Sequence, residues 1–350
     1  MSFIKDLAKE LGDDASIASE GKGAAEYTGF IDTGCYILNA GLSGSIFGGL
    51  PNNKIVAFAG EPATGKTYLA LGVVKQYLDA DKKAIVAYFE TEGAITKDML
   101  TARGIDTSRV LLIEPDTIQT FRAKAIKIIE AFEKQDENKR HPMLFVLDSL
   151  GMLSTTKEME DTADGKETRD MTKAQIIKAT FRVLTLRLAK AKIPLILTNH
   201  VYDAVGVYFP TKVISGGSGL KYAASIIVSL SKKKDRDDAK DVVGALIVVK
   251  MDKARLTKEN TTFTMRLSYK TGLDKYYGLL ELAEKYGIFK KGSRNYELPD
   301  GTKAFEKAIN DNPEKYFTPE VLIKLDEAAK QEFLYGTTEE DDVPLAEIQE

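Results

Sequence analysis

The chain has 350 residues, which is enough for one large or two moderate domains with a substantial apolar core. Its formal net charge of -3 argues against a protein that coats nucleic acid through overall basicity, although a local basic groove is compatible with it. Cys35 is the only cysteine, which excludes an internal disulfide, and only two histidines accompany it, which disfavours zinc chemistry. The first residues are charged where a signal peptide is apolar, and no stretch approaches the roughly 20 apolar residues of a membrane span. We therefore expect a cytoplasmic protein without membrane contact.

The first 31 residues are predicted to form an arm in front of the main domain. A short helix ends at Gly12, and its apolar face consists of Phe3, Ile4, Leu7 and Leu11. A small, polar, glycine-rich stretch over 13–26 follows as a connector. The spacing leaves open whether this apolar face caps its own core or docks on a neighbouring subunit.

A phosphate-binding motif follows a strand-like apolar run at 54–59. GEPATGKT, Gly60 to Thr67, matches G-x-x-x-x-G-K-[ST] at each fixed position, and a helical pattern follows at 68–78. The glycines let backbone N–H groups turn inward at a helix N-terminus, where they favour an anion. Lys66 can reach the outer phosphates, and the Thr67 hydroxyl is suited to bind Mg²⁺. The predicted nucleotide-binding residues are Gly60, Glu61, Pro62, Ala63, Thr64, Gly65, Lys66, Thr67 and Tyr68.

Two further strands are predicted to deliver carboxylates to the same edge of the sheet. The apolar run at 84–93 ends in Glu90 and Glu92, and the run at 143–150 ends in Asp148. Ligands of doubly wound sheets bind beyond the carboxyl ends of the strands, so Asp148 is placed to join the Mg²⁺ shell. A glutamate there can polarise a water for attack on a γ-phosphate, although solvated loop acids remain the alternative. Ser149 lies outside a G-x-S-x-G elbow, so we do not interpret it as a nucleophile.

Two loops are predicted after neighbouring strands. The charge-rich stretch 154–173 has few large apolar residues and reads as a long mobile loop. A helix and the strand 193–200 follow, and Asn199 and His200 end that strand beside the end of the Asp148 strand. His200 is a candidate sensor of the γ-phosphate, with a structural histidine as the alternative. The second loop-like stretch, 201–220, ends in SGGSGL.

The remaining chain is predicted to contain a hairpin, a basic cluster and a small terminal unit. Strands at 225–230 and 245–251 flank SKKKDRDD, which is typical of a solvated hairpin tip. The stretch 249–259 then gathers four basic residues, Lys250, Lys253, Arg255 and Lys258. From Leu279 a smaller unit begins, and the acidic composition of 337–350 predicts a disordered tail.

The ordered set of motifs resembles the RecA strand-exchange recombinases, and most of all the UvsX recombinases of tailed bacteriophages. The set comprises the P-loop, the strand ends E-T-E, D-S and N-H, the run GGSGLKYAAS and a basic V-V-K stretch. The resemblance implies an α/β fold with a RecA-like P-loop ATPase core, in which helices flank a mostly parallel twisted sheet. It implies an oligomerisation arm at 1–31, the ATPase core at 32–270, a small α/β subdomain at 271–336 and the acidic tail at 337–350.

The resemblance also implies a set of roles. Proteins of this family bind ATP between subunits and polymerise on single-stranded DNA. Glu92 matches the catalytic glutamate and Glu90 an accompanying acid, while His200 matches a sensor of the γ-phosphate that is usually glutamine. Met99 matches a position where the family often stacks a tyrosine on adenine, which predicts a relaxed preference for ATP.

The two predicted loops match the DNA-binding loops of the family, at about 154–172 and 202–218. The first is acidic rather than basic, so we expect contact with DNA through a few side chains and backbone N–H groups. The residues predicted to contact DNA are Lys157, Lys166, Arg169, Gly216 and Gly217.

The basic cluster matches two family lysines, two residues apart, that reach the ATP of the neighbouring subunit. Lys250 and Lys253 are three apart, which on a regular strand points them to opposite faces. Lys253 and Arg255 keep the two-residue spacing. We therefore predict Lys253 and Arg255 as the trans cations and Lys250 as secondary, with a solvated strand end as the alternative.

Together these features predict a DNA-dependent ATPase with ATP and Mg²⁺ as cofactors. It would form filaments on single-stranded DNA and catalyse homologous pairing and strand exchange in recombination and repair. The expected partners are single-stranded and double-stranded DNA, further copies of the chain, and loading and single-strand-binding proteins. Two alternatives are a RecA-core ring motor or helicase and a nucleotide-gated scaffold without strand exchange.

Overall fold

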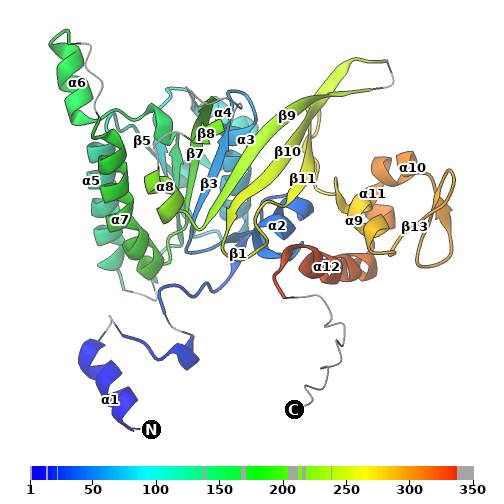
Figure 1. The fold of residues 1–350 in the computed structure, drawn as a ribbon, viewed down its shortest axis with the longest axis horizontal. Coiled ribbons are helices and arrows are strands. Elements are labelled where there is room, and N and C mark those ends of the chain that lie inside the picture. Colours follow the sequence, from blue (N-terminus) through cyan, green and yellow to red (C-terminus); the bar gives the residue numbers. More distant parts are fainter. Residues whose placement is uncertain are drawn as a thin grey trace, which may run out of the picture.

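A large twisted sheet forms the centre of the molecule (Figure 1). The computed structural model describes residues 2–12, 15–21, 23–136, 139–166, 171–203, 212–214, 218–237 and 239–336. Within them the strand order is β12-β11-β10-β9-β3-β7-β6-β4-β5, with β8 beside β7. The strands are β3 (Ile55–Gly60), β4 (Ile85–Glu90), β5 (Val110–Ile113), β6 (Met143–Asp148), β7 (Leu195–Asp203), β8 (Lys212–Ile214), β9 (Ile226–Arg236), β10 (Val242–Ala254), β11 (Thr262–Ser268) and β12 (Gly272–Leu273).

The strands from β9 to β5 run parallel, and β10, β11 and β12 extend the sheet in antiparallel fashion. Every residue of β3 and β6 is buried, as expected for parallel strands covered on both faces. Alternate residues of one strand belong to different apolar clusters: Val56 and Phe58 face one way, and Ile55 and Ala57 the other. The predicted mostly parallel α/β core is therefore confirmed.

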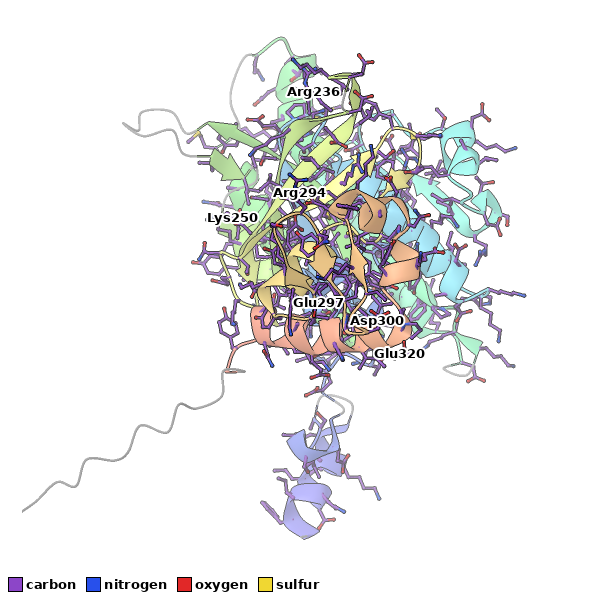
Figure 2. The ribbon with its side chains drawn as sticks, turned by 90° about the vertical axis from the view of Figure 1, so that its right-hand side faces the viewer. Arg236, Lys250, Arg294, Glu297, Asp300 and Glu320 are labelled. Atoms are coloured by element: carbon purple, nitrogen blue, oxygen red, sulfur yellow. The ribbon has the colours of Figure 1, made fainter. Side chains whose placement is uncertain are left out.

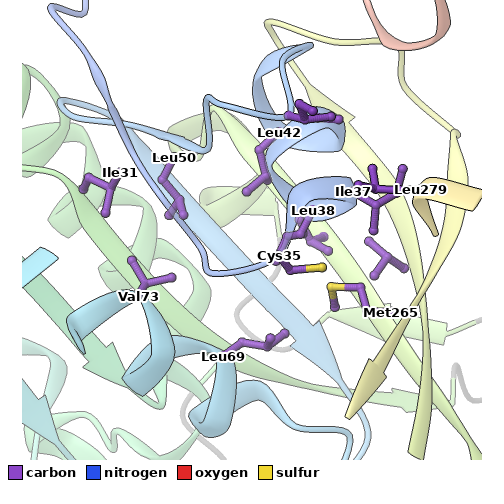
Figure 3. Packing of buried hydrophobic residues seen from close by; sticks show 14 of the residues in the cluster. Ile31, Cys35, Ile37, Leu38, Leu42, Leu50, Leu69, Val73, Met265 and Leu279 are labelled. Carbon is purple, nitrogen blue, oxygen red and sulfur yellow. The ribbon is translucent and has the colours of Figure 1, made fainter. Parts of the chain in front are cut away.

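Helices cover both faces of this sheet. The face of Phe58 packs against α2 (Tyr36–Ser43) and α3 (Lys66–Ala80), and Figure 3 shows Leu38, Leu42 and Leu69 among the side chains of this buried cluster. The other face packs against α5 (Ile118–Glu133) and α7 (Lys173–Ala191). The short helices α4 (Lys97–Ala102) and α8 (Ser218–Ala223) complete these layers. None of the helices in the described ranges is long and apolar enough to cross a membrane.

The C-terminal unit shares the larger apolar cluster. It contains α9 (Leu279–Lys285), β13 (Lys290–Lys291), β14 (Tyr296–Glu297), β15 (Lys303–Ala304), α10 (Glu306–Asp311), α11 (Pro313–Tyr316) and α12 (Pro319–Phe333). Leu279 and Leu325 lie in the same buried cluster as Leu38. The Asp326 carboxylate of α12 also accepts the backbone N–H of Ile46 at 2.9 Å. The core is thus continuous across the predicted boundary at 270, and that boundary stays a prediction.

The N-terminal helix lies apart from the sheet (Figure 1). It is α1 (Ser2–Leu11), followed by a 3-10 turn at Ala18–Glu20 and by β1 (Phe30–Ile31), which pairs with β2 (Leu50–Pro51). The predicted helix is confirmed, but its apolar face is exposed, with Phe3 at 77%. This face therefore does not cap the core of its own chain.

The first predicted loop is partly helical. Residues Thr156–Ala163 form α6, which stands off the core in Figure 1. A capping box explains the difference from a loop: the Thr155 hydroxyl accepts the N–H of Glu158, and the Glu158 carboxylate accepts the N–H of Thr155. Lys173 also pairs with Glu158 at 3.2 Å. The prediction of a loop relied on the low apolar content of this stretch and did not consider the capping box that stabilises α6. The second loop falls largely outside the described residues.

Candidate nucleotide-binding and catalytic site

The predicted site residues meet at one edge of the sheet, where the parallel strands end. The register places Gly60 of β3 beside His200 of β7, and Glu90 of β4 beside Asp148 of β6. Because β7 and β6 are neighbours, the four strand ends form one continuous edge. This arrangement is where ligands of open α/β sheets bind.

The P-loop folds around the ammonium of Lys66. Its Nζ donates to the carbonyl oxygens of Gly60 at 3.0 Å and Glu61 at 2.9 Å. Burial lowers the pKa of Lys66, while Glu92 and Asp148 oppose that shift. Gly65 begins α3 without a side-chain cap and with φ at 95°, so the first N–H groups of the helix are available to an anion.

Gly60 is required where the strand turns into the P-loop. A Cβ at this position would lie 2.6 Å from Thr64 Oγ1 and 2.7 Å from the Leu230 carbonyl oxygen. The backbone of β9 therefore leaves no room for a side chain there.

Asp148 is held by two hydroxyl groups. It is buried, and its Oδ2 accepts the hydroxyl of Tyr88 at 2.8 Å, while Oδ1 accepts that of Thr198. Burial, reinforced by Asp148, raises the pKa of Tyr88, so the tyrosine remains a donor. These bonds orient a carboxylate at the strand end. A carboxylate and the hydroxyl of Thr67 are oxygen donors of the kind that suits Mg²⁺.

The described residues contain no cluster of three or more metal-binding side chains that could hold an ion by themselves. Mg²⁺ at nucleotide sites commonly relies on one or two protein ligands plus phosphates and waters. Asp148 and Thr67 therefore fit a metal that arrives with the nucleotide.

The two glutamates of the E-T-E stretch have different environments. Glu90 is buried, and its carboxylate accepts the backbone N–H groups of Glu92 at 2.9 Å, Gly93 at 2.8 Å and Ala94 at 3.1 Å. It is therefore a structural acid that fixes the turn after β4, rather than the solvated loop acid we left open. The side chain of Glu92 is 31% exposed and remains accessible to a ligand.

The Glu92 carboxylate contacts two polar side chains from neighbouring strands. Its Oε1 accepts the hydroxyl of Ser149 at 2.7 Å and lies 3.2 Å from Nε2 of His200. The fold thus brings Glu92 and His200 together, as their places at the strand ends predicted. Sequence reasoning considered Ser149 only as a nucleophile; its place directly after Asp148 was the signal for a role at this edge.

A cavity of about 590 Å³ lies beside the first turns of α3. Helix α3 lines it with Tyr68 and Gly72, and the connection between β11 and β12 contributes Tyr269. The guanidinium of Arg103 stacks over the Tyr68 ring at 4.2 Å, which is cation–π geometry. Met99 is not among the lining residues; it packs against the larger apolar cluster, and its contact with a base stays a prediction.

The basic cluster on β10 differs from the regular strand that we expected. Lys250 lies opposite Ser229 and Lys253 opposite Ile227, because a β-bulge inserts Asp252 between them. Positions 229 and 227 share a face, so Lys250 and Lys253 also share a face and do not point apart. Lys250 lies at the surface (Figure 2) and pairs with Asp252 at 3.2 Å.

Lys253 lies further along the same strand, and Arg255 directly follows its last residue, Ala254. Lys253 Nζ donates to the carbonyl oxygens of Lys221 and Ala224, the latter at 2.7 Å, at the end of α8. Burial, followed by the nearby charge of Arg255, lowers the pKa of Lys253. Arg255 is exposed, and its N–H bonds the carbonyl oxygen of Ser225.

Arg255 is level with the beginning of β3. Ser225 bonds the carbonyl oxygen of Ile55, which lies five residues before Gly60, or roughly 16 Å along the strand. The charges of Lys192 and Arg255 also add to the burial that lowers the pKa of Lys54, just before β3. Arg255 is therefore at the opposite end of β3 from the P-loop of its own chain.

The predicted DNA-binding residues are only partly within the described structure. Lys157 is exposed on α6. Lys166 Nζ pairs with Asp164 at 2.9 Å and lies 4.0 Å from Asp161, so neighbouring acids balance its charge. Arg169, Gly216 and Gly217 lie outside the described residues.

The P-loop between β3 and α3 and the aspartate at the end of a neighbouring buried strand define a P-loop nucleotide-binding protein. A family model described as the RecA N-terminal domain matches residues 1–274. The chain belongs to this family, as the order of its motifs predicted.

Curated relatives agree with this assignment. The chain is 29% identical over 255 residues to a "Recombination and repair protein" of Enterobacteria phage T4. That match covers 73% of this chain and 63% of the phage protein, so the chain spans slightly under two thirds of that relative. It is also 26% identical over 300 residues to a "Protein RecA" of Pseudarthrobacter chlorophenolicus, covering 84% and 81% of the two chains. A "Protein RecA" of Bifidobacterium longum is 28% identical over 325 residues, covering 89% and 74%.

Proposed function

We propose that this protein is a DNA-dependent ATPase of recombination and repair. It assembles on single-stranded DNA as a helical filament and catalyses homologous pairing and strand exchange. The observation that supports the proposal is the separation of two groups: the P-loop edge holds Lys66, Glu92 and His200, and Arg255 lies at the other end of β3 from the P-loop of its own chain. Membership of the RecA family supports the same function.

The P-loop edge binds ATP. The N–H groups at the start of α3 hold the phosphates, and Lys66 exchanges its two carbonyl partners for the outer phosphate oxygens. Thr67 and Asp148 would hold Mg²⁺, which would neutralise phosphate charge. The cavity beside Tyr68 takes the base, with the Arg103–Tyr68 stack as its wall. This stack can take the role of the base-stacking tyrosine that the family often has at the position of Met99.

Glu92 is the base of the hydrolytic step. Its carboxylate takes a proton from a water molecule as the water oxygen bonds the γ-phosphorus and the bond to the ADP oxygen breaks. His200 contacts the same carboxylate and lies three residues before the end of β7, the strand that leads into the second predicted DNA-binding loop. His200 is therefore placed to couple the presence of the γ-phosphate to the conformation of that loop.

Cations of the next subunit complete the site. Lys253 and Arg255 are the trans residues, and the bulge at Asp252 brings Lys250 onto the same face. When a neighbouring nucleotide is in place, Lys253 exchanges the carbonyl oxygens at the end of α8 for phosphate oxygens. The exposed apolar face of α1 supplies a second contact between subunits. Lys157 and Lys166 contribute phosphate contacts on DNA that are weak singly and accumulate along the filament.

A strand-exchange assay with circular single-stranded and homologous linear duplex DNA tests the proposal. We expect ATP-dependent joint molecules and exchanged products, together with DNA-stimulated ATP hydrolysis. A ring helicase would unwind the duplex without homology, and a scaffold would show no stimulation by DNA. ATP binding without homologous pairing would overturn the proposed function.

A further inference from the structure

The hydroxyl of Ser149 is buried against the carboxylate that activates water. Ser149 is 0% exposed, and its Oγ donates to Glu92 Oε1 at 2.7 Å. A short bond from a hydroxyl to a carboxylate is among the stronger hydrogen bonds in proteins. The roles given above to Glu92, Asp148 and His200 leave this contact unexplained.

The peptide of Ser149 is fixed by the neighbouring strand end. Thr91 Oγ1 accepts the N–H of Ser149 at 2.8 Å and donates to the Ser149 carbonyl oxygen at 2.9 Å. The N–H of Thr91 also bonds the carbonyl oxygen of Asp148 at 2.9 Å. Because these bonds join the ends of β4 and β6, the position of the Ser149 hydroxyl is set by the sheet itself.

The backbone that carries Glu92 is anchored to the same strand end. The buried Glu90 carboxylate holds the N–H groups of Glu92, Gly93 and Ala94. One acid therefore fixes the main chain at Glu92, and Ser149 fixes its carboxylate. Such supporting contacts are what hold a catalytic group within the narrow range of productive geometry.

Both side-chain contacts use one oxygen of Glu92. Ser149 Oγ and His200 Nε2 meet Oε1, at 2.7 and 3.2 Å. Two donors on one oxygen restrict rotation of the carboxylate, and the described residues supply no hydrogen bond to Oε2, which stays available to a ligand. The closer and fully buried of the two donors is Ser149.

We propose that Ser149 is a positioning residue for ATP hydrolysis: its hydroxyl holds Oε1 of Glu92 so that Oε2 accepts the proton of the attacking water. This role rests on the proposed function of Glu92 as the base. Ser149 does not touch the reacting atoms and acts through the orientation of the carboxylate.

The test is Ser149→Ala, with DNA-stimulated ATP hydrolysis and nucleotide binding measured separately. We expect kcat to fall about ten-fold or more, since misplacing a catalytic group by a fraction of an ångström is costly. KM for ATP, binding of a fluorescent ATP analogue and the unfolding temperature should stay near the wild-type values. Ser149→Thr retains the hydroxyl and should recover at least part of kcat.

A double variant separates positioning from a general structural role. In a Glu92→Gln background, Ser149→Ala should cause no further loss of kcat, because the carboxylate to be oriented is already gone. Thr180→Val is the matched control, since the buried Thr180 hydroxyl of α7 has no hydrogen-bond partner within the described structure. We expect this control to hydrolyse ATP as the wild type does.

Three results would overturn the inference: wild-type kcat in Ser149→Ala, a further full loss in the Glu92→Gln background, or parallel losses of kcat, nucleotide binding and unfolding temperature. A wild-type protein without DNA-stimulated hydrolysis would instead refute the proposed function.

Discussion

The P-loop edge of the sheet and the basic face of β10 differ in how deeply their charged groups are buried and in what those groups are bonded to. At the P-loop edge two acids are buried and hydrogen-bonded within the chain: Asp148 has two hydroxyl donors and Glu90 has three N–H donors. On β10 the cations lie at or near the surface, where Lys253 is bonded to carbonyl oxygens and Lys250 to an adjacent acid. The first region brings its acids and the P-loop to one edge within a single chain, whereas the second presents cations at or near the surface.

This difference indicates which effects a substitution will have in each region. A buried acid that is bonded to several N–H groups, such as Glu90, costs stability when those bonds are weakened. Exposed cations contribute little to folding, so their substitution should leave the protomer intact. Defects on β10 should therefore appear only when subunits assemble.

Lys66→Ala should have the largest effect. Removing the ammonium leaves the phosphate oxygens without their main cation, so we expect ATP hydrolysis to fall by about a hundred-fold or more. Nucleotide binding, measured by fluorescence of an ATP analogue, should weaken at the same time. Lys127→Ala is the control, because Lys127 is exposed on α5, which packs against the opposite face of the sheet from α3. Equal activity of Lys66→Ala and wild type would contradict the site.

Glu92→Gln should abolish turnover while preserving binding. The amide cannot take a proton from water, so kcat should fall by about a hundred-fold or more. Because Glu92 is partly exposed, the unfolding temperature should change little. A Glu92→Gln variant with near-normal kcat would show that another group activates the water.

Glu90→Gln should lower the stability of the protein more than its turnover. An amide supplies one acceptor oxygen to three N–H groups and presents a donor to the rest, which predicts a loss of about 1–3 kcal/mol in the free energy of unfolding. Chemical denaturation measures this loss. If Glu90→Gln were as stable as wild type but inactive, Glu90 would take part in the reaction instead of supporting the turn.

Lys157→Ala should have the smallest effect. Loss of one exposed phosphate contact is expected to weaken binding to single-stranded DNA about two-fold and to reduce the slope of log affinity against log salt by about one. Lys166→Ala is the comparison, since acids already balance Lys166, and it should change binding less. Fluorescence anisotropy at several salt concentrations measures both. If Lys157→Ala left the slope of log affinity against log salt unchanged, the proposed contact between α6 and DNA would be contradicted.

The sequence predicted the nucleotide edge well because its signals are local. The P-loop and the acids at the strand ends can each be recognised from a few consecutive residues. Parallel strands then bring their carboxyl ends to one edge of the sheet. Their partners were harder to find. That Ser149 would meet Glu92, and that Glu90 would turn towards backbone N–H groups, depends on the pairing of β4 with β6.

The regions predicted least well are those whose geometry depends on one inserted residue or on a capping interaction. A regular period of two placed Lys250 and Lys253 on opposite faces, and only the pairing with β9 reveals the bulge. The first predicted loop looked structureless by composition, yet the reciprocal bonds of Thr155 and Glu158 begin a helix there. The cavity beside α3 joins Tyr68, Arg103 and Tyr269, which no local pattern connects.

Mixing two inactive variants tests most directly whether neighbouring subunits share the ATP site. Lys66→Ala keeps the cations of β10 but loses the P-loop lysine, and Lys253→Ala/Arg255→Ala has the converse defect. In equal mixture on single-stranded DNA, about a quarter of head-to-tail interfaces would pair an intact P-loop with intact cations, so ATP hydrolysis should return to about that fraction of wild type. If each variant is inactive alone and the mixture stays inactive, or if the double variant hydrolyses ATP normally by itself, the shared site is contradicted.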